Sequence, residues 1–152
     1  MIAIDPGANG GIAWTDENGN PQAVSMPATV RDVRKALVLA IGQTQHKQVF
    51  IEKVGGYIAG TPSPGSAAFT FGYNAGVLEG LLCSSDIPYE FVLPVTWQKP
   101  LGLGGRKSCD SPSQWKNKLK AAAQRKFPTI DVTLKTADAL LILDFALSKQ
   151  SS

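Results

Sequence analysis

The chain has 152 residues, of which 43% are hydrophobic and 18% are charged, and its formal net charge is +3. This length and composition suit a single globular domain with one core, and we expect that domain to span residues 1–152. No apolar run approaches the roughly 18 residues of a membrane span, and no basic-then-apolar leader opens the chain, so we expect a cytosolic location and no membrane partner.

The first third of the chain alternates short apolar runs with turn-forming residues. It predicts three strands, a helix and a fourth strand, over residues 2–5, 11–15, 22–26, 27–43 and 48–52. An Asn-Gly pair within residues 17–20 is typical of the hairpin turn between the second and third strands. The first strand ends in Asp5 and the fourth ends in Glu52. A buried carboxylate is costly unless it meets a cation or a hydrogen-bond donor, so both acids are candidates for a site.

The rest of the chain is predicted to be mainly helical. It reads in order as a loop over 55–65, a helix over 66–83, a strand over 88–93, a helical turn over 94–100, a glycine-rich loop over 101–105 and helices over 111–127 and 136–147. Glycines recur every fourth residue in the helix over 66–83, which favours close packing against a sheet. The fold class is therefore mixed α/β, with a partly parallel five-stranded sheet flanked by helices.

Asp5, Glu52 and Asp138 are each the only acid in an apolar neighbourhood, and charges are almost never buried unpaired. A shared divalent cation would account for all three. Ligands that are all oxygen favour Mg²⁺ or, alternatively, Mn²⁺ over zinc. Each acid alone also has a simpler explanation: a turn for Asp5, a strand-end charge for Glu52 and the helix dipole for Asp138. His46 lies in a polar segment and is expected to be exposed.

Positive charge is concentrated in one part of the chain. Residues 99–126 contain eight lysines and arginines but a single acid, Asp110. Such a surface suits contact with a phosphate backbone, although a solvated helix face is an equal alternative.

Five motifs together resemble the RuvC-like Holliday-junction resolvases, and most closely the phage and organelle branch of that family. They are Ile4-Asp5-Pro6-Gly7, Ile51-Glu52-Lys53-Val54, Phe71-Gly72 with Gly76-Val77-Leu78-Glu79-Gly80, Thr96-Trp97-Gln98-Lys99 and Ala137-Asp138-Ala139-Leu140-Leu141-Ile142. The resemblance runs from Met1 to about Leu147. It implies an RNase H-like fold, a homodimer, and cleavage of two opposed strands of a four-way DNA junction with two Mg²⁺ ions per active site.

The resemblance also implies roles for particular residues. The acids of the family correspond to Asp5, Glu52 and Asp138, as metal ligands. Many members have a further ligand three residues before the last aspartate, where this chain has Lys135, and Asp131 would substitute only if its loop folds back. A junction-binding protein with impaired catalysis therefore stays an alternative.

Other residues are expected to contact DNA. Lys116 is the candidate catalytic lysine beside the scissile phosphate, although Lys99 and Lys107 also lie in the region where the family has its lysines. Tyr57 and Phe69 are candidates for base stacking. Trp97 is expected in the core. The full set of expected DNA contacts is Tyr57, Phe69, Lys99, Arg106, Lys107 and Lys118.

Two further alternatives remain open from the sequence. Another RNase H-like nuclease, acting on RNA–DNA hybrids or other branched DNA, would use the same acids. An ATP-binding fold of the actin and sugar-kinase type also begins with an aspartate and glycines, but one domain lacks the second lobe that encloses a nucleotide. The resolvase hypothesis predicts a dimer interface on the helix over 66–83, and a location in the cytoplasm, on the nucleoid or in an organelle matrix.

Overall fold

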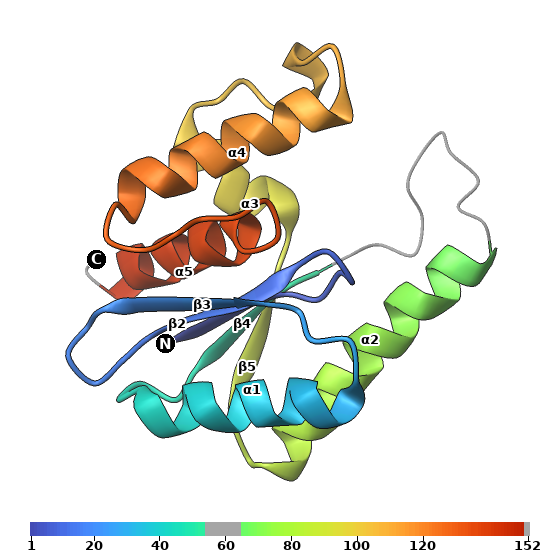
Figure 1. Cartoon of the computed structure of the whole chain (residues 1–152), viewed down its shortest axis with the longest axis vertical. Helices are drawn as coiled ribbons and strands as arrows, with labels where there is room; N and C mark the ends of the chain where they lie inside the picture. The colour runs from blue at the N-terminus through green and yellow to red at the C-terminus, as the bar shows by residue number, and fades with distance from the viewer. Residues whose placement is uncertain (54–64, 151–152) are drawn as a thin grey trace.

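The computed structural model describes residues 1–53 and 65–150 and contains a five-stranded sheet in the order β3-β2-β1-β4-β5 (Figure 1). The first three strands are antiparallel, and β4 and β5 run parallel to β1. Their bounds are β1 (Ile2–Asp5), β2 (Gly11–Thr15), β3 (Pro21–Ser25), β4 (Val49–Glu52) and β5 (Tyr89–Val92). The predicted mixed sheet is confirmed, with β3 beginning one residue earlier than expected.

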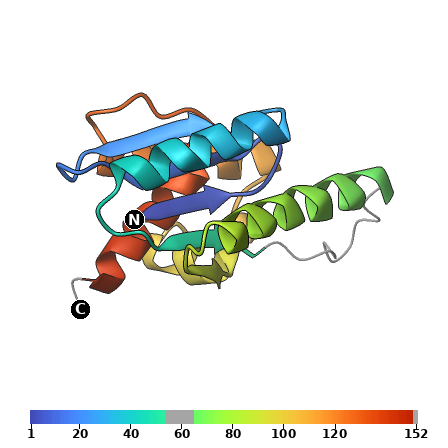
Figure 2. The ribbon, with the colours of Figure 1, turned by 90° about the horizontal axis from the view of Figure 1, so that it is seen from below.

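Helices cover both faces of this sheet. They are α1 (Val30–Gln43), α2 (Gly65–Ser84), α3 (Pro94–Gln98), α4 (Pro112–Lys126) and α5 (Ala137–Gln150), with short 3-10 turns at Lys99–Leu101 and Arg106–Ser108. Figures 1 and 2 show α1 and α2 on one face and α4 and α5 on the other. α1 begins later than predicted because Thr29 caps it, accepting a hydrogen bond from the Asp32 N–H. Among the described residues, no helix is both long and apolar enough to span a membrane.

Strand alternation assigns the side chains of β1 and β4 to the two faces. Ile2 and Ile4 belong to the core beneath α1 and α2, whereas Ala3 belongs to the core beneath α5. In β4, Phe50 lies on the α5 face. Because side chains alternate along a strand, Asp5 and Glu52 continue the face that α5 covers.

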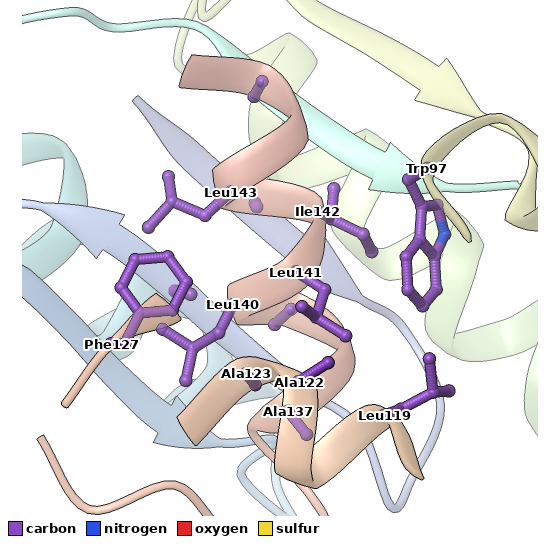
Figure 3. Packing of buried hydrophobic residues seen from close by; sticks show 14 of the residues in the cluster. Trp97, Leu119, Ala122, Ala123, Phe127, Ala137, Leu140, Leu141, Ile142 and Leu143 are labelled. Carbon is purple, nitrogen blue, oxygen red and sulfur yellow. The ribbon is translucent and has the colours of Figure 1, made fainter. Parts of the chain in front are cut away.

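The helix α5 forms the centre of the larger core. Every residue over 137–143 is buried, and Figure 3 shows Trp97, Leu119 and Phe127 arranged around this segment. Trp97 is 1% exposed, which confirms its predicted place in the core. A helix that is apolar on all sides is stable only inside a protein. The position of α5 between the sheet and α4 meets that requirement.

The expectation that the glycines of α2 pack closely against the sheet is wrong. Leu78 and Leu82 make the helix's contact with the core, whereas Gly72, Gly76 and Gly80 are exposed. A Cβ atom built at any of the three would have no described atom within 4 Å. The glycines therefore lie on a face of α2 that the described residues leave uncovered.

Candidate active site

The sheet brings two of the predicted acids together at one edge. β1 and β4 are parallel neighbours, and Ile4 pairs with Ile51. Asp5 follows Ile4 in β1, and Glu52 follows Ile51 in β4. Both side chains lie on the sheet face that α5 covers. Because neighbouring parallel strands end at the same edge, these two carboxylates are adjacent.

Two glycines let the backbone close around Asp5. A Cβ atom on Gly10 would lie 2.3 Å from the carbonyl oxygen of Asp5 and 2.5 Å from its Cγ. A Cβ atom on Gly11 would lie 2.9 Å from the carbonyl oxygen of Lys135. Gly10 therefore gives the Asp5 side chain its space, and Gly11 lets the chain entering α5 approach the end of β1.

The start of α5 is fixed by two threonines that bond each other. The Thr133 N–H donates to Thr136 Oγ1 at 3.0 Å, and the Thr136 N–H donates to Thr133 Oγ1 at 3.2 Å. Reciprocal bonds of this kind satisfy backbone donors that a helix terminus leaves without partners. Asp138 follows in the first turn and is 4% exposed, and its charge acts on the carboxyls of both Asp5 and Glu52.

Asp138 forms an ion pair with Lys116 of α4, through its Oδ2 atom. The other oxygen, Oδ1, is buried and has no hydrogen-bond partner among the described residues. Burial lowers the pKa of Lys116, but Asp138, followed by Asp5 and Glu52, outweighs it and raises the pKa above its usual 10.5. All three predicted acids therefore act on one ammonium group.

Burial is also the main influence on the other two acids. It raises the pKa of Asp5, with the charge of Asp138 adding to the effect, while the Gly7 N–H and Lys116 oppose it. The pKa of Glu52 rises from 4.5 to about 8, through burial and then the charges of Asp5 and Asp138. The indole N–H of Trp97 donates to Glu52 Oε1 at 3.1 Å. Carboxylates in such a field favour the approach of a cation.

The donor set fits a hard divalent cation, because it consists of carboxylate oxygens and leaves one buried oxygen of Asp138 without a partner. In the described part of the chain, however, no three acidic, histidine or cysteine side chains are already grouped closely enough to hold a metal ion. The convergence of Asp5, Glu52 and Asp138 on one cation thus stays a prediction.

The remaining predicted site residues lie elsewhere on the surface. Lys99, Arg106 and Lys107 are exposed on the segment before α4, and Lys118 is partly buried on α4. Phe69 is 73% exposed on α2. Tyr57 lies outside the described residues, as does nearly all of the predicted loop over 55–65. None of the four cations forms an ion pair with a described residue.

Lys135, the departure from the family pattern, lies on another side of the helix start. Lys135 lines a cavity of about 360 Å³ between the β1–β2 loop, α1 and α2, together with Ala8, Thr29 and Tyr73. The three acids do not line this cavity. Asp131 and His46 are exposed.

Sequence reasoning missed two contributions to the site. Trp97 was assigned to the core alone, but a buried indole needs a hydrogen-bond partner, and that requirement pointed to an acceptor near it. The role of Gly10 and Gly11 was also missed. Two adjacent glycines at the start of a strand indicate close approach of other backbone, which was the available signal.

No protein-family profile and no curated protein sequence matches this chain. Solved structures do. The chain is similar to Thermus thermophilus RuvC in complex with a Holliday junction substrate, with a TM-score of 0.61 and 13% identity, over 100% of this chain and 97% of that one. It is also similar to a second Thermus thermophilus RuvC structure, with a TM-score of 0.61 and 15% identity, over 99% and 96%. At these identities the likeness concerns the fold, and the chain has the RNase H-like fold that RuvC has.

Proposed function

We propose that this protein is a structure-selective DNA endonuclease that resolves four-way junctions by metal-dependent phosphodiester hydrolysis, with paired nicks in opposed strands. The observation that carries the proposal is that Asp5, Glu52 and Asp138, hereafter the acid cluster, all act electrostatically on Lys116 at one edge of an RNase H-like sheet. The solved RuvC structure with a Holliday junction substrate supports the choice of DNA substrate. The family motifs support the phage and organelle branch.

The residues of the cluster have separable roles in this proposal. Asp5, Glu52 and Asp138 would hold Mg²⁺ or Mn²⁺, and the bound ion supplies Lewis-acid activation of water and charge neutralisation at the phosphate. Trp97 orients Glu52 through its hydrogen bond. Lys116 is 48% exposed in its side chain, so its ammonium is able to meet a phosphate oxygen that enters from solvent. Lys99, Arg106, Lys107 and Lys118 would bind the backbone outside this centre.

A homodimer is part of the proposal, because two symmetric nicks need two active sites in a fixed relation. We place its interface on α2. Phe69 and Tyr73 of this helix are 73% and 53% exposed, and the glycine face of the helix has open space above it. We also propose that Phe69 stacks on a base at the junction centre, and that Tyr57 does the same.

The test is incubation of the protein with a labelled mobile four-way junction in Mg²⁺. Paired symmetric nicks are expected, and matched flap and RNA–DNA hybrid substrates should be cleaved more slowly. Asp5→Asn should abolish cleavage while junction binding in a mobility-shift assay is retained. Asp86→Asn, in the turn after α2, is the matched control, since Asn tolerates the positive φ of 53° found there.

Each other outcome selects a different function. Preferred cleavage of the hybrid would identify a nuclease of another RNase H-like class. Tight junction binding without nicking in either Mg²⁺ or Mn²⁺ would identify a binding protein, the alternative that Lys135 raised. Cleavage that survives Asp5→Asn would refute the assignment of the acid cluster.

A further inference from the structure

The ion pair between Lys116 and Asp138 joins a half-exposed cation to a buried acid. The Asp138 side chain is 6% exposed and lies in the first turn of a helix whose next residues are all buried, so it has little freedom to move. The Lys116 side chain is 48% exposed at the end of a flexible four-carbon stem. If this contact breaks, Lys116 is the partner that leaves.

The contact uses one oxygen of a carboxylate that the proposed function assigns to a metal ion. Lys116 binds Asp138 Oδ2, whereas Oδ1 is buried without a partner. Asp5 and Glu52 also attract the same ammonium. A lysine ammonium and a divalent cation both satisfy a group of carboxylates, but two cations held on the same carboxylate repel each other at short range. The two cations therefore compete for the Asp138 carboxylate.

Resting on the proposed function, we infer that Lys116 is an internal cation that a divalent metal displaces from Asp138. The displaced ammonium turns toward solvent, where a substrate phosphate enters. Metal binding therefore frees the Lys116 ammonium to contact the phosphate. Before that, Lys116 acts as a positioning residue for the metal site. Until a metal binds, the Lys116 ammonium offsets the negative charge of the carboxylates.

The test is the affinity for Mn²⁺ and Mg²⁺, measured by calorimetry on the whole chain without DNA. Lys116→Gln should bind metal about five- to tenfold more tightly than the wild type, because a competing charge has been removed. Lys116→Arg keeps the charge and should stay within about twofold of the wild type. Buffers are matched in ionic strength, because salt screens half-exposed charges.

The chain offers a matched control on the same two helices. Lys126 of α4 pairs with Asp144 of α5 at 2.9 Å, with similar exposure of the lysine, 40%. Lys126→Gln removes the same charge from the same helix without touching the acid cluster. It should leave metal affinity unchanged, so any gain seen in Lys116→Gln belongs to the cluster and not to the net charge.

A second measurement uses the wild type alone, and it decides the matter if Lys116→Gln does not fold. Brief labelling of amines with acetic anhydride, read by mass spectrometry, should modify Lys116 faster once Mg²⁺ is added, while Lys126 reacts at the same rate. An unchanged rate at Lys116 would overturn the inference, since the ammonium would then stay on Asp138 when metal binds.

The outcomes separate this inference from the proposed function. If the wild type binds metal and Lys116→Gln binds it equally or more weakly, Lys116 supports the site instead of competing for it, and only this inference falls. If no variant takes up metal, the inference and the metal-dependent nuclease proposal both fall. Tighter binding by Lys116→Gln, with Lys126→Gln unchanged, supports the exchange.

Discussion

Gly10 and Gly11, at the start of β2 beside the end of β1, have no room for a side chain, whereas Gly72, Gly76 and Gly80 of α2 have open space above them. On the α5 face, glycine brings the Asp5 carboxylate and the start of α5 together. On the α2 face, glycine contributes nothing to the packing of the described residues. The comparison separates a face that holds the candidate site from a helix face that the described residues leave uncovered.

The largest expected effect is on stability at the centre of the α5 face. Leu141 is fully buried in α5 (Figure 3), and Leu141→Ala should lower the free energy of unfolding by about 2–5 kcal/mol, because it leaves a cavity. Phe69→Ala on α2 should change it by less than about 0.5 kcal/mol, since Phe69 is 73% exposed. Urea denaturation measures both. Equal losses would remove the contrast between the two faces.

The next effect tests the close approach at Asp5. Gly10→Ala forces a methyl group to within 2.3 Å of the Asp5 carbonyl oxygen, so we expect a loss of about 1–3 kcal/mol in unfolding free energy. Junction cleavage should fall about 100-fold, because a small displacement of a ligand acid is costly. Gly42→Ala in α1 adds the same methyl group in open space and should leave cleavage unchanged. Wild-type cleavage by Gly10→Ala would show that this packing does not position Asp5.

A smaller effect concerns pH. The folded pKa of Glu52 is about 8, above the usual 4.5, so the folded chain binds more protons than the unfolded chain between these values. This stability is fully present below pH 4.5 and is lost as the pH rises through 8, by about 2 kcal/mol after allowance for partial exposure.

Unfolding in urea with EDTA, at pH 5 and pH 8.5, measures this effect. Glu52→Gln has no carboxylate to ionise and should show a flatter pH profile. Asp5 contributes in the same direction, because its pKa is also raised. A wild-type profile as flat as that of Glu52→Gln would contradict the assigned environment of Glu52.

The same comparison explains what the sequence could predict. Short apolar runs identified β1 and β4 and the acids at their ends, because such runs are a local property of the sequence. The burial of Asp138 also followed from its apolar neighbours. The glycine face of α2 was assigned wrongly, because a helix that is apolar on nearly every side does not reveal which side the sheet covers.

Contacts between distant residues were beyond sequence reasoning for another reason. The Trp97–Glu52 hydrogen bond joins residues 45 apart, and the Lys116–Asp138 pair joins residues 22 apart. Neither pattern repeats along the chain, so only the tertiary packing of α3, α4 and α5 against the sheet determines them. Family resemblance predicts contact of Lys116 with phosphate but not its ion pair with Asp138.

The smallest effect tests what the α2 face meets. Gly76→Ala should raise the unfolding free energy of the monomer by about 0.5–1 kcal/mol, because alanine favours a helix and its methyl group meets nothing within 4 Å. If a second copy packs on this face, the same methyl group obstructs the interface and weakens the dimer. Denaturation at low protein concentration and sedimentation at high concentration measure the two effects separately. A more stable monomer with an unchanged dimer constant would move the proposed interface away from α2, because a glycine face in contact would not accept a methyl group without loss.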